Sequence, residues 1–256
     1  MATKVAPKKP PARAAAEHVL YLYGVTKEVP GEGRISNRGI DGVAAVEPVS
    51  CAGLLCWVSR VNRADYADGL AENMENLDWL AAASLRHQQV VSEIASRTTI
   101  LPARFGTVFL TRASLAADVQ RRRSTLLKSF KRLAEADEWG IKIFALAQPR
   151  SQISAASGKD YLRQKAAALK KPSTRVLEPE VKKFIAELEQ LAADTAAGGK
   201  VSSGQAGLEW HGSLLLRREK YQQFQRTLDQ YSQRWQGRHR IECTGPWPPY
   251  SFVKDE

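Results

Sequence analysis

Short apolar runs that end near glycine or proline alternate with longer segments whose apolar residues recur every three or four positions. The run "HVLYLYGV" at residues 18–25 is rich in β-branched and aromatic side chains, which favour strands. Two further runs, "GVAAVEPV" and "GLLCWVSRV", lie on either side of residues 51–53 and predict a hairpin. Pro48 cannot donate a ladder hydrogen bond, so its strand is predicted to be short or at a sheet edge.

From residue 63 onward the apolar spacing becomes helical and predicts two amphipathic helices. Between them, "TTILPARFGTVF" breaks the helix at Pro102 and permits a turn at Gly106. The strand "WGIKIFALA" is then predicted to close this half of the chain. The first helix carries Leu77, Leu80, Ser84, His87, Val91 and Ile94 on its apolar stripe, and the second carries Leu115, Val119, Leu126, Phe130 and Leu133.

The second half follows a linker with Ser, Pro and Gly, "QPRSQISAASGKD". Residues 159–196 predict two helices, with Pro179 in the first turn of the second. The run "LEWHGSLLLRRE" predicts a strand, and "HRIEC" predicts another in the same sheet. The helix between them has one aromatic face, which favours a role in the core: Tyr221, Phe224, Leu228, Tyr231 and Trp235.

This mixture of short strands and covering helices predicts an α+β protein rather than a doubly wound parallel sheet. We expect a disordered basic tail at residues 1–16, a ferredoxin-like N-domain at residues 17–148 and a smaller α+β C-domain at residues 149–256. No apolar stretch approaches the roughly 20 residues that cross a bilayer. Because the N-terminus also lacks the apolar core of a signal peptide, a cytoplasmic protein with no membrane partner is expected.

The formal net charge of +11 raises the alternative of a basic nucleic-acid-binding protein. Part of this charge lies in the tail, and most of the rest is spread along predicted helices. The cluster at Arg121, Arg122 and Arg123 is explained more simply by the solvated face of a helix. We therefore expect no nucleic-acid partner.

Catalytic and cofactor motifs are absent from the sequence, so neither an enzyme nor a cofactor is expected. The three cysteines include no CxxC pair, which favours buried free thiols. His87 lies on a helical apolar stripe, where a hydrogen-bonded histidine at the edge of the core is favoured over a proton carrier. Asp137 and Glu138 are expected to be solvated at a helix end.

Seven blocks resemble the gas vesicle protein F/L family in their residues and in their order. They are "YLYGV", "GLLCWVSRV", "NLDWLAAASLRHQQVV", "LPARFGTVF", "EWGIKIF", "YLRQK" and "TGPWPPYSF". The resemblance implies a two-domain α+β protein whose N-domain is a modified ferredoxin-like sandwich. It also implies a minor gas vesicle component that binds the shell protein and prevents its aggregation during nucleation and assembly. Other gas vesicle accessory proteins are further expected partners.

Two of these blocks provide the candidate partner-binding residues: Leu101, Pro102, Arg104 and Phe105 from the first, and Trp247 and Tyr250 from the second. Proline fixes φ and biases the preceding residue toward extended backbone, so a stiff polyproline segment is predicted from Trp247. About three residues per turn would place Trp247 and Tyr250 on one side. Their rings either seal the C-domain, the favoured alternative, or contact the shell protein.

Overall fold

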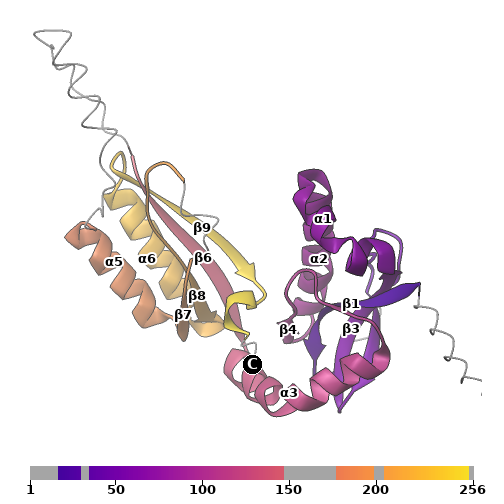
Figure 1. Cartoon of the computed structure of the whole chain (residues 1–256). Helices are drawn as coiled ribbons and strands as arrows, with labels where there is room; N and C mark the ends of the chain where they lie inside the picture. The colour runs from indigo at the N-terminus through magenta and orange to yellow at the C-terminus, as the bar shows by residue number, and fades with distance from the viewer. Residues whose placement is uncertain (1–16, 30–34, 147–176, 199–204, 254–256) are drawn as a thin grey trace, which may run out of the picture. The chain divides into compact units, whose positions relative to one another are not determined.

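The structure is a computed structural model that describes residues 17–29, 35–146, 177–198 and 205–253. The chain divides into two compact units, Met1–Leu127 and Lys128–Glu256 (Figure 1). The predicted tail, the linker of the second half, its first helix and the block "YLRQK" lie outside the described residues. Mixed helix and sheet confirms the predicted α+β class.

The first sheet consists of five antiparallel strands: β1 (His18–Thr26), β2 (Glu47–Cys51), β3 (Leu54–Asn62), β4 (Ile100–Pro102) and β5 (Val108–Phe109). Their order is β2-β3-β1-β4, and β5 also pairs with β1. The predicted hairpin and the edge position of Pro48 are confirmed. At its turn, Ala52 and Gly53 have φ of 53° and 76°, as tight two-residue hairpin turns require.

Helical segments of this part of the chain are a π-helical turn (Ala64–Asp68), α1 (Leu70–Glu75), α2 (Leu77–Ala95) and α3 (Arg112–Leu133). All five residues predicted on the apolar side of α3 are buried. The prediction for α2 is wrong at Leu77, whose side chain is 78% exposed. Leu77 is the first residue of α2, directly after the cap formed by Asn76, and the first buried residue of the helix is Ala83.

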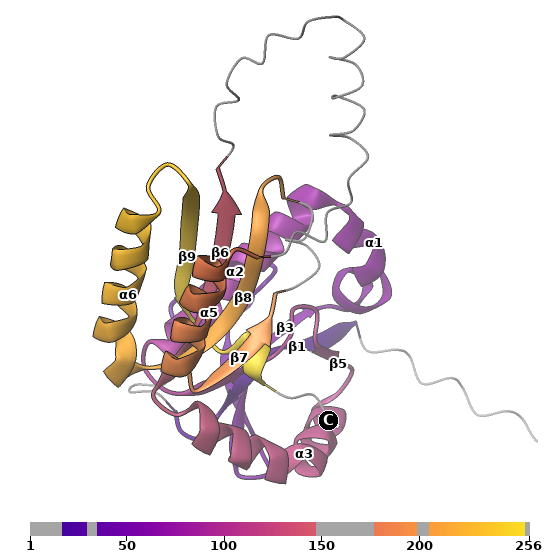
Figure 2. The same ribbon diagram turned by 90° about the vertical axis from the view of Figure 1, so that its left-hand side faces the viewer.

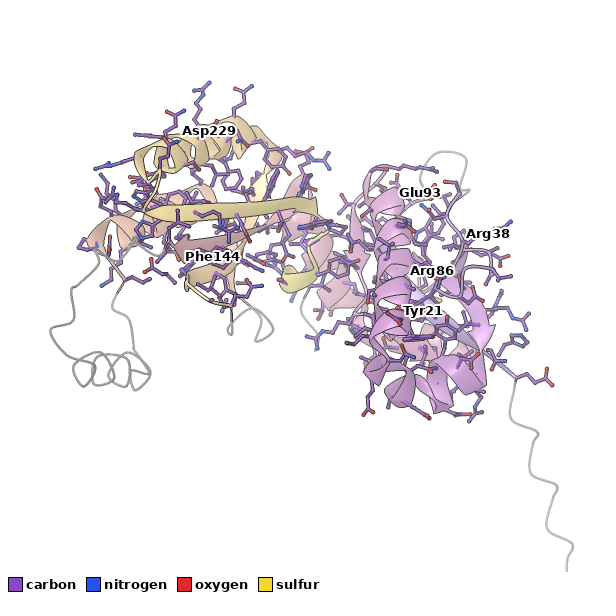
Figure 3. The ribbon with its side chains drawn as sticks, turned by 90° about the horizontal axis from the view of Figure 1, so that it is seen from above. Tyr21, Arg38, Arg86, Glu93, Phe144 and Asp229 are labelled. Atoms are coloured by element: carbon purple, nitrogen blue, oxygen red, sulfur yellow. The ribbon has the colours of Figure 1, made fainter. Side chains whose placement is uncertain are left out.

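The chain between β1 and β2 is held against α2 by the carboxylate of Glu93 (Figure 3). This carboxylate accepts hydrogen bonds from the backbone N–H of Ser36 and Asn37, at 2.9 and 3.0 Å, and from both their side chains. Burial opposes the charge, but these hydrogen bonds outweigh it and lower the pKa of Glu93 to about 2. Further along, Ile40 is buried and its N–H donates to the Tyr23 hydroxyl at 2.7 Å.

The second sheet consists of β6 (Ala136–Ala145), β7 (Asp194–Ala197), β8 (Leu208–Arg217) and β9 (His239–Trp247), in the order β7-β8-β6-β9. Helices α5 (Pro179–Leu191) and α6 (Tyr221–Arg234) cover one face of it (Figures 1 and 2). Their buried residues pack with Ile141, Ile143, Leu214 and Leu216 in one core. The predicted first-turn Pro179 and the buried aromatic face of α6 are confirmed.

The prediction that residues 139–147 close the first half is wrong, because β6 is a central strand of the second sheet. It pairs with β8 on one side and with β9 on the other. The two units therefore divide at residues 127/128, earlier than the predicted 148/149. The physical reason is that β6 is apolar on both faces and needs partners on both edges, which β8 and β9 supply.

We expect Glu93→Gln to lower the free energy of unfolding of the first unit by about 2 kcal/mol, because charge-assisted hydrogen bonds to two residues are weakened. Since the folded pKa lies below the unfolded value, this stabilisation is present above about pH 4.5 and is lost as the pH falls toward 2. Urea denaturation at pH 7 measures the change. Glu72→Gln, on exposed α1, is the control, and equal stabilities of the two variants would contradict the prediction.

Candidate functional site

The block "LPARFG" forms β4 and the loop after it, and only its second half reaches the surface. Leu101 and Pro102 are buried in the sheet, so they position the loop rather than contact a partner. Arg104 is exposed and Phe105 is partly buried. The approach of this strand to β1 is close: a Cβ atom on Gly24 would lie 2.7 Å from the Leu101 carbonyl oxygen.

An aromatic cluster fixes the loop from below. The Tyr21 hydroxyl accepts a hydrogen bond from the N–H of Gly106 at 3.1 Å and lies 2.9 Å from Nδ1 of His87. The Phe105 ring meets the His87 ring edge-on at 5.8 Å and the Trp79 ring at 6.4 Å. Three of the seven family-like blocks, from β1, α2 and the loop, therefore converge at this cluster.

His87 is a neutral member of this cluster. Its side chain is buried, and burial lowers the pKa of His87 to about 4, although a backbone hydrogen bond with Ala103 acts in the opposite direction. The prediction of a hydrogen-bonded core histidine is confirmed. Together with Tyr21, its ring packs against the loop that carries Arg104 and Phe105.

The second set of candidate residues lies in the C-terminal segment, residues 244–253, which folds against β6. The carboxylate of Glu138 accepts the N–H of Ser251 at 2.8 Å and the hydroxyl of Ser251 at 2.6 Å. Glu138 is 7% exposed. The prediction that Asp137 and Glu138 are solvated at a helix end is wrong, because both belong to β6 and face side-chain partners.

A second contact fixes the end of the segment. The guanidinium of Arg132 donates to the carbonyl oxygen of Phe252 and forms an ion pair of 2.6 Å with Asp194 of β7. Phe252 is buried, and the turn Tyr250–Phe252 is a short 3₁₀-helix. The segment is thus tied to α3, β6 and β7 at once.

Trp247 and Tyr250 do not share one environment. Trp247 is 41% exposed and still pairs with Glu138 at the end of β9, whereas Tyr250 is half-buried and opens the 3₁₀-helix. Burial raises the pKa of Tyr250, and the charge of Glu138 acts in the same direction. Pro248 and Pro249 between them are buried. The seal is therefore made by the prolines and Phe252, and Trp247 faces outward.

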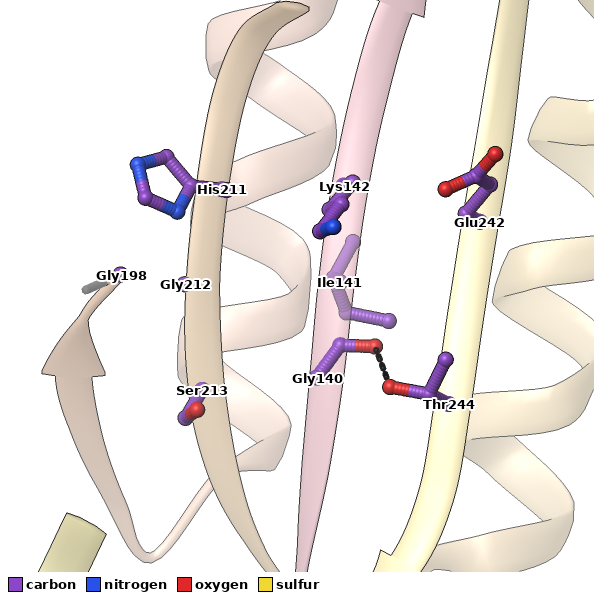
Figure 4. A pocket seen from close by; sticks show the side chains of 9 residues that line it. All are labelled: Gly140, Ile141, Lys142, Gly198, His211, Gly212, Ser213, Glu242 and Thr244. Atoms are coloured by element: carbon purple, nitrogen blue, oxygen red, sulfur yellow. Dashed lines mark hydrogen bonds between the residues drawn. The ribbon is translucent and has the colours of Figure 1, made fainter. Parts of the chain in front are cut away.

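The face of the second sheet opposite α5 and α6 contains a cavity of about 200 Å³ (Figure 4). His211 of β8, Lys142 of β6 and Glu242 of β9 lie side by side at one end of it. Gly140 and Thr244 lie at the other end, where the Thr244 hydroxyl is 3.5 Å from the Gly140 carbonyl oxygen. No sequence motif predicts this cavity, because its residues come from separate strands.

The remaining candidate chemistry is accounted for by local contacts. Arg121 and Arg122 form ion pairs with Asp118, and Arg123 donates to the Ala52 carbonyl oxygen at 2.9 Å, so the basic cluster of α3 is engaged within the first unit. Across the described residues, no group of three or more His, Cys, Asp or Glu side chains is arranged to hold a metal ion. The same residues include no helix that is long and apolar enough to span a membrane.

The cysteines are free where the structure describes them, and two are buried as predicted. These are Cys51 and Cys56 of the hairpin, where burial, with a smaller effect of Cys51, raises the pKa of the Cys56 thiol. Cys243 of β9 differs from the prediction, because it is exposed.

The clusters in both units are built from the blocks that resemble one family, and a family model decides the assignment. The model of the gas vesicle synthesis protein GvpL/GvpF matches residues 19–254. The chain belongs to this family. Its relative "Gas vesicle protein L" from Streptomyces sp. (strain CB03234) is 27% identical over 256 residues, covering 93% of this chain and 94% of the relative.

Two solved structures share the fold of the chain. The gas vesicle protein GvpF from Anabaena sp. PCC7120 is 19% identical, with a TM-score of 0.66, covering 93% of this chain and 97% of that one. GvpF from Microcystis aeruginosa is 21% identical, with a TM-score of 0.63, covering 92% and 99%. The likeness of this GvpL/GvpF family member to these structures therefore includes parts of both units.

We expect the first unit to lose about 2 kcal/mol of its free energy of unfolding between pH 7.5 and pH 5, because the unfolded chain protonates His87 and the folded chain does not. The stabilisation is complete above about pH 6.5 and falls as the pH drops toward 4. Hydrogen exchange of the β1 amides measures it. The variant His87→Gln should lack this part of the pH dependence, and an unchanged slope would refute the assignment.

Ser251→Ala should lower the free energy of unfolding of the second unit by about 1–2 kcal/mol, because it leaves one oxygen of the buried Glu138 carboxylate without its hydroxyl donor. Thermal unfolding, with hydrogen exchange of the β6 amides as the probe, measures the loss. Ser232→Ala on the exposed face of α6 is the matched control. A loss no larger than that of the control would count against a structural seal.

Proposed function

We propose that the protein is an accessory protein of gas vesicle assembly that binds the shell protein and prevents its aggregation during nucleation. The observation that carries this proposal is the family match across residues 19–254, which includes both units and both candidate blocks. The similarity to gas vesicle proteins L and F supports a gas vesicle role.

The proposed role follows from the apolar surface that an unassembled shell protein exposes. A shell protein whose assembled wall encloses gas exposes a large apolar surface before assembly, and such surfaces aggregate unless a partner covers them. The outward-facing Trp247 and the loop with Arg104 and Phe105 offer aromatic contacts of the kind that dominate protein interfaces. Because the sequence carries no nucleotide-binding motif, the proposed action is to hold the shell protein.

We extend the proposal to the domain architecture of the protein and to its location in the cell. The strand order β4-β1-β3-β2 with α2 between β3 and β4 supports a modified ferredoxin-like first domain in which a loop pinned by Glu93 replaces the first helix. The second unit has the same strand order, with β6, β7, β8 and β9 in the equivalent positions. We place the protein in the cytoplasm at the gas vesicle, with other accessory proteins as further partners.

Co-expression with the shell protein followed by pull-down tests the function. The full chain should retain the shell protein, and it should reduce the light scattering caused by aggregates of the shell protein. No retention by the folded chain would refute the proposal.

Trp247→Ala should weaken retention about tenfold or more while the melting temperature stays within a few degrees, because the ring is 41% exposed. Leu77→Ala, at a 78% exposed residue of the first unit, is the control.

A further inference from the structure

A row of small residues crosses the helix-free face of the second sheet. Register places its members directly opposite one another on neighbouring strands, so they share one face. Ile141 and Leu214, the next residues along β6 and β8, face the core on the other side. From β7 to β9 the row consists of Ala196, Ser213, Gly140 and Thr244.

This row is the floor of a trough with two different walls. The next row on one side contains Glu138, which pairs with Trp247 and binds Ser251 of the C-terminal segment. On the other side stand His211, Lys142 and Glu242 (Figure 4). The cavity of about 200 Å³ lies between these side chains and the floor residues Ser213, Gly140 and Thr244.

The cavity is lined by one cationic side chain, Lys142, whose charge is not neutralised by a carboxylate of the described residues. The ammonium of Lys142 donates to the Gln205 side-chain oxygen at 3.3 Å and has no carboxylate partner among the described residues. Glu242, the acidic side chain of the lining, forms an ion pair with Arg240. The hydroxyls of Ser213 and Thr244 face the same space. An occupant with one negative charge and hydrogen-bond acceptors would satisfy the Lys142 ammonium and the Ser213 hydroxyl.

We propose that the trough binds a segment of a partner protein that lies across the open face and places an acidic side chain, Asp or Glu, against Lys142. The identity of the partner as the shell protein rests on the proposed function. Small floor residues let a partner backbone approach closely, and the exposed part of Trp247 packs beside it. The volume equals several waters at about 30 Å³ each, which suits a carboxylate and its methylene stem.

A single carboxylate fits this site better than a phosphate does. Lys142 provides one cation without a carboxylate partner, and Glu242 lies directly across from it on β9. A doubly charged phosphate would meet repulsion from Glu242 that one ammonium does not offset. His211 stands opposite Lys142 on β8, but its ring lies over Gly198, so it borders the site on the β7 side (Figure 4).

Charge reversal tests the site in the shell-protein pull-down. Lys142→Glu should weaken retention about tenfold or more, whereas Lys182→Glu, exposed on α5, should leave it unchanged. Acidic residues of the shell protein are then changed to Lys one at a time, and one such change should restore retention by Lys142→Glu. Wild-type retention by Lys142→Glu, or loss without any restoring change, would overturn the proposal.

A second measurement separates this site from the proposed function. Acetate, as the simplest carboxylate, is titrated into the purified full chain at constant ionic strength while the amide signals of Gly140, Ser213 and Thr244 are followed by NMR. Saturable shifts that disappear in Lys142→Gln support the site even if the shell protein is not retained. Shifts equal to those caused by chloride would overturn it even if the shell protein is retained.

Discussion

The buried carboxylate of Glu138 is the interaction on which the second unit depends most. It lies on β6, the strand between β8 and β9, and it takes both donors of Ser251. A buried carboxylate without donors costs several kcal/mol, so this pairing fixes the path of the C-terminal segment against β6. The C-terminal segment consequently covers one end of the open sheet face and leaves the other end free.

The first unit holds its corresponding segments with neutral groups and with the partly buried carboxylate of Glu93. Tyr21 joins the loop of "LPARFG" to His87, and Glu93 joins the chain before β2 to the same helix. In both units a connecting or terminal segment is therefore held by hydrogen bonds to a helix or strand. These segments also present exposed side chains to solvent, such as those of Arg104 and Trp247.

Local pattern predicted the elements well and their partners less well. The hairpin at Ala52 and Gly53 follows from turn chemistry, and the burial along α3 follows from helical periodicity. The sheet that β6 joins could not be predicted, because strand pairing depends on residues about 60 to 110 positions away. The strand β7, "DTAA", was missed because four small and polar residues carry little strand signal.

The same limits apply to the candidate sites. Family-like blocks led to Arg104, Phe105 and Trp247, which reach the surface, but also to Leu101 and Pro102, which are buried. The composition of "LPARFG" does not distinguish residues that build a loop from residues that the loop presents. The cavity beside Lys142 had no sequence signal, because cross-strand register alone brings His211, Lys142 and Glu242 together.

Stability and binding are separable in the C-terminal segment for a physical reason. The free energy of sealing comes from burial of the prolines and Phe252 and from the Glu138 carboxylate, while much of the Trp247 ring stays in water. An exposed aromatic side chain contributes little to its own fold but gains free energy when a partner covers it. A rigid seal that presents a ring beside an open sheet face therefore allows a partner to bind without unfolding the end of the chain.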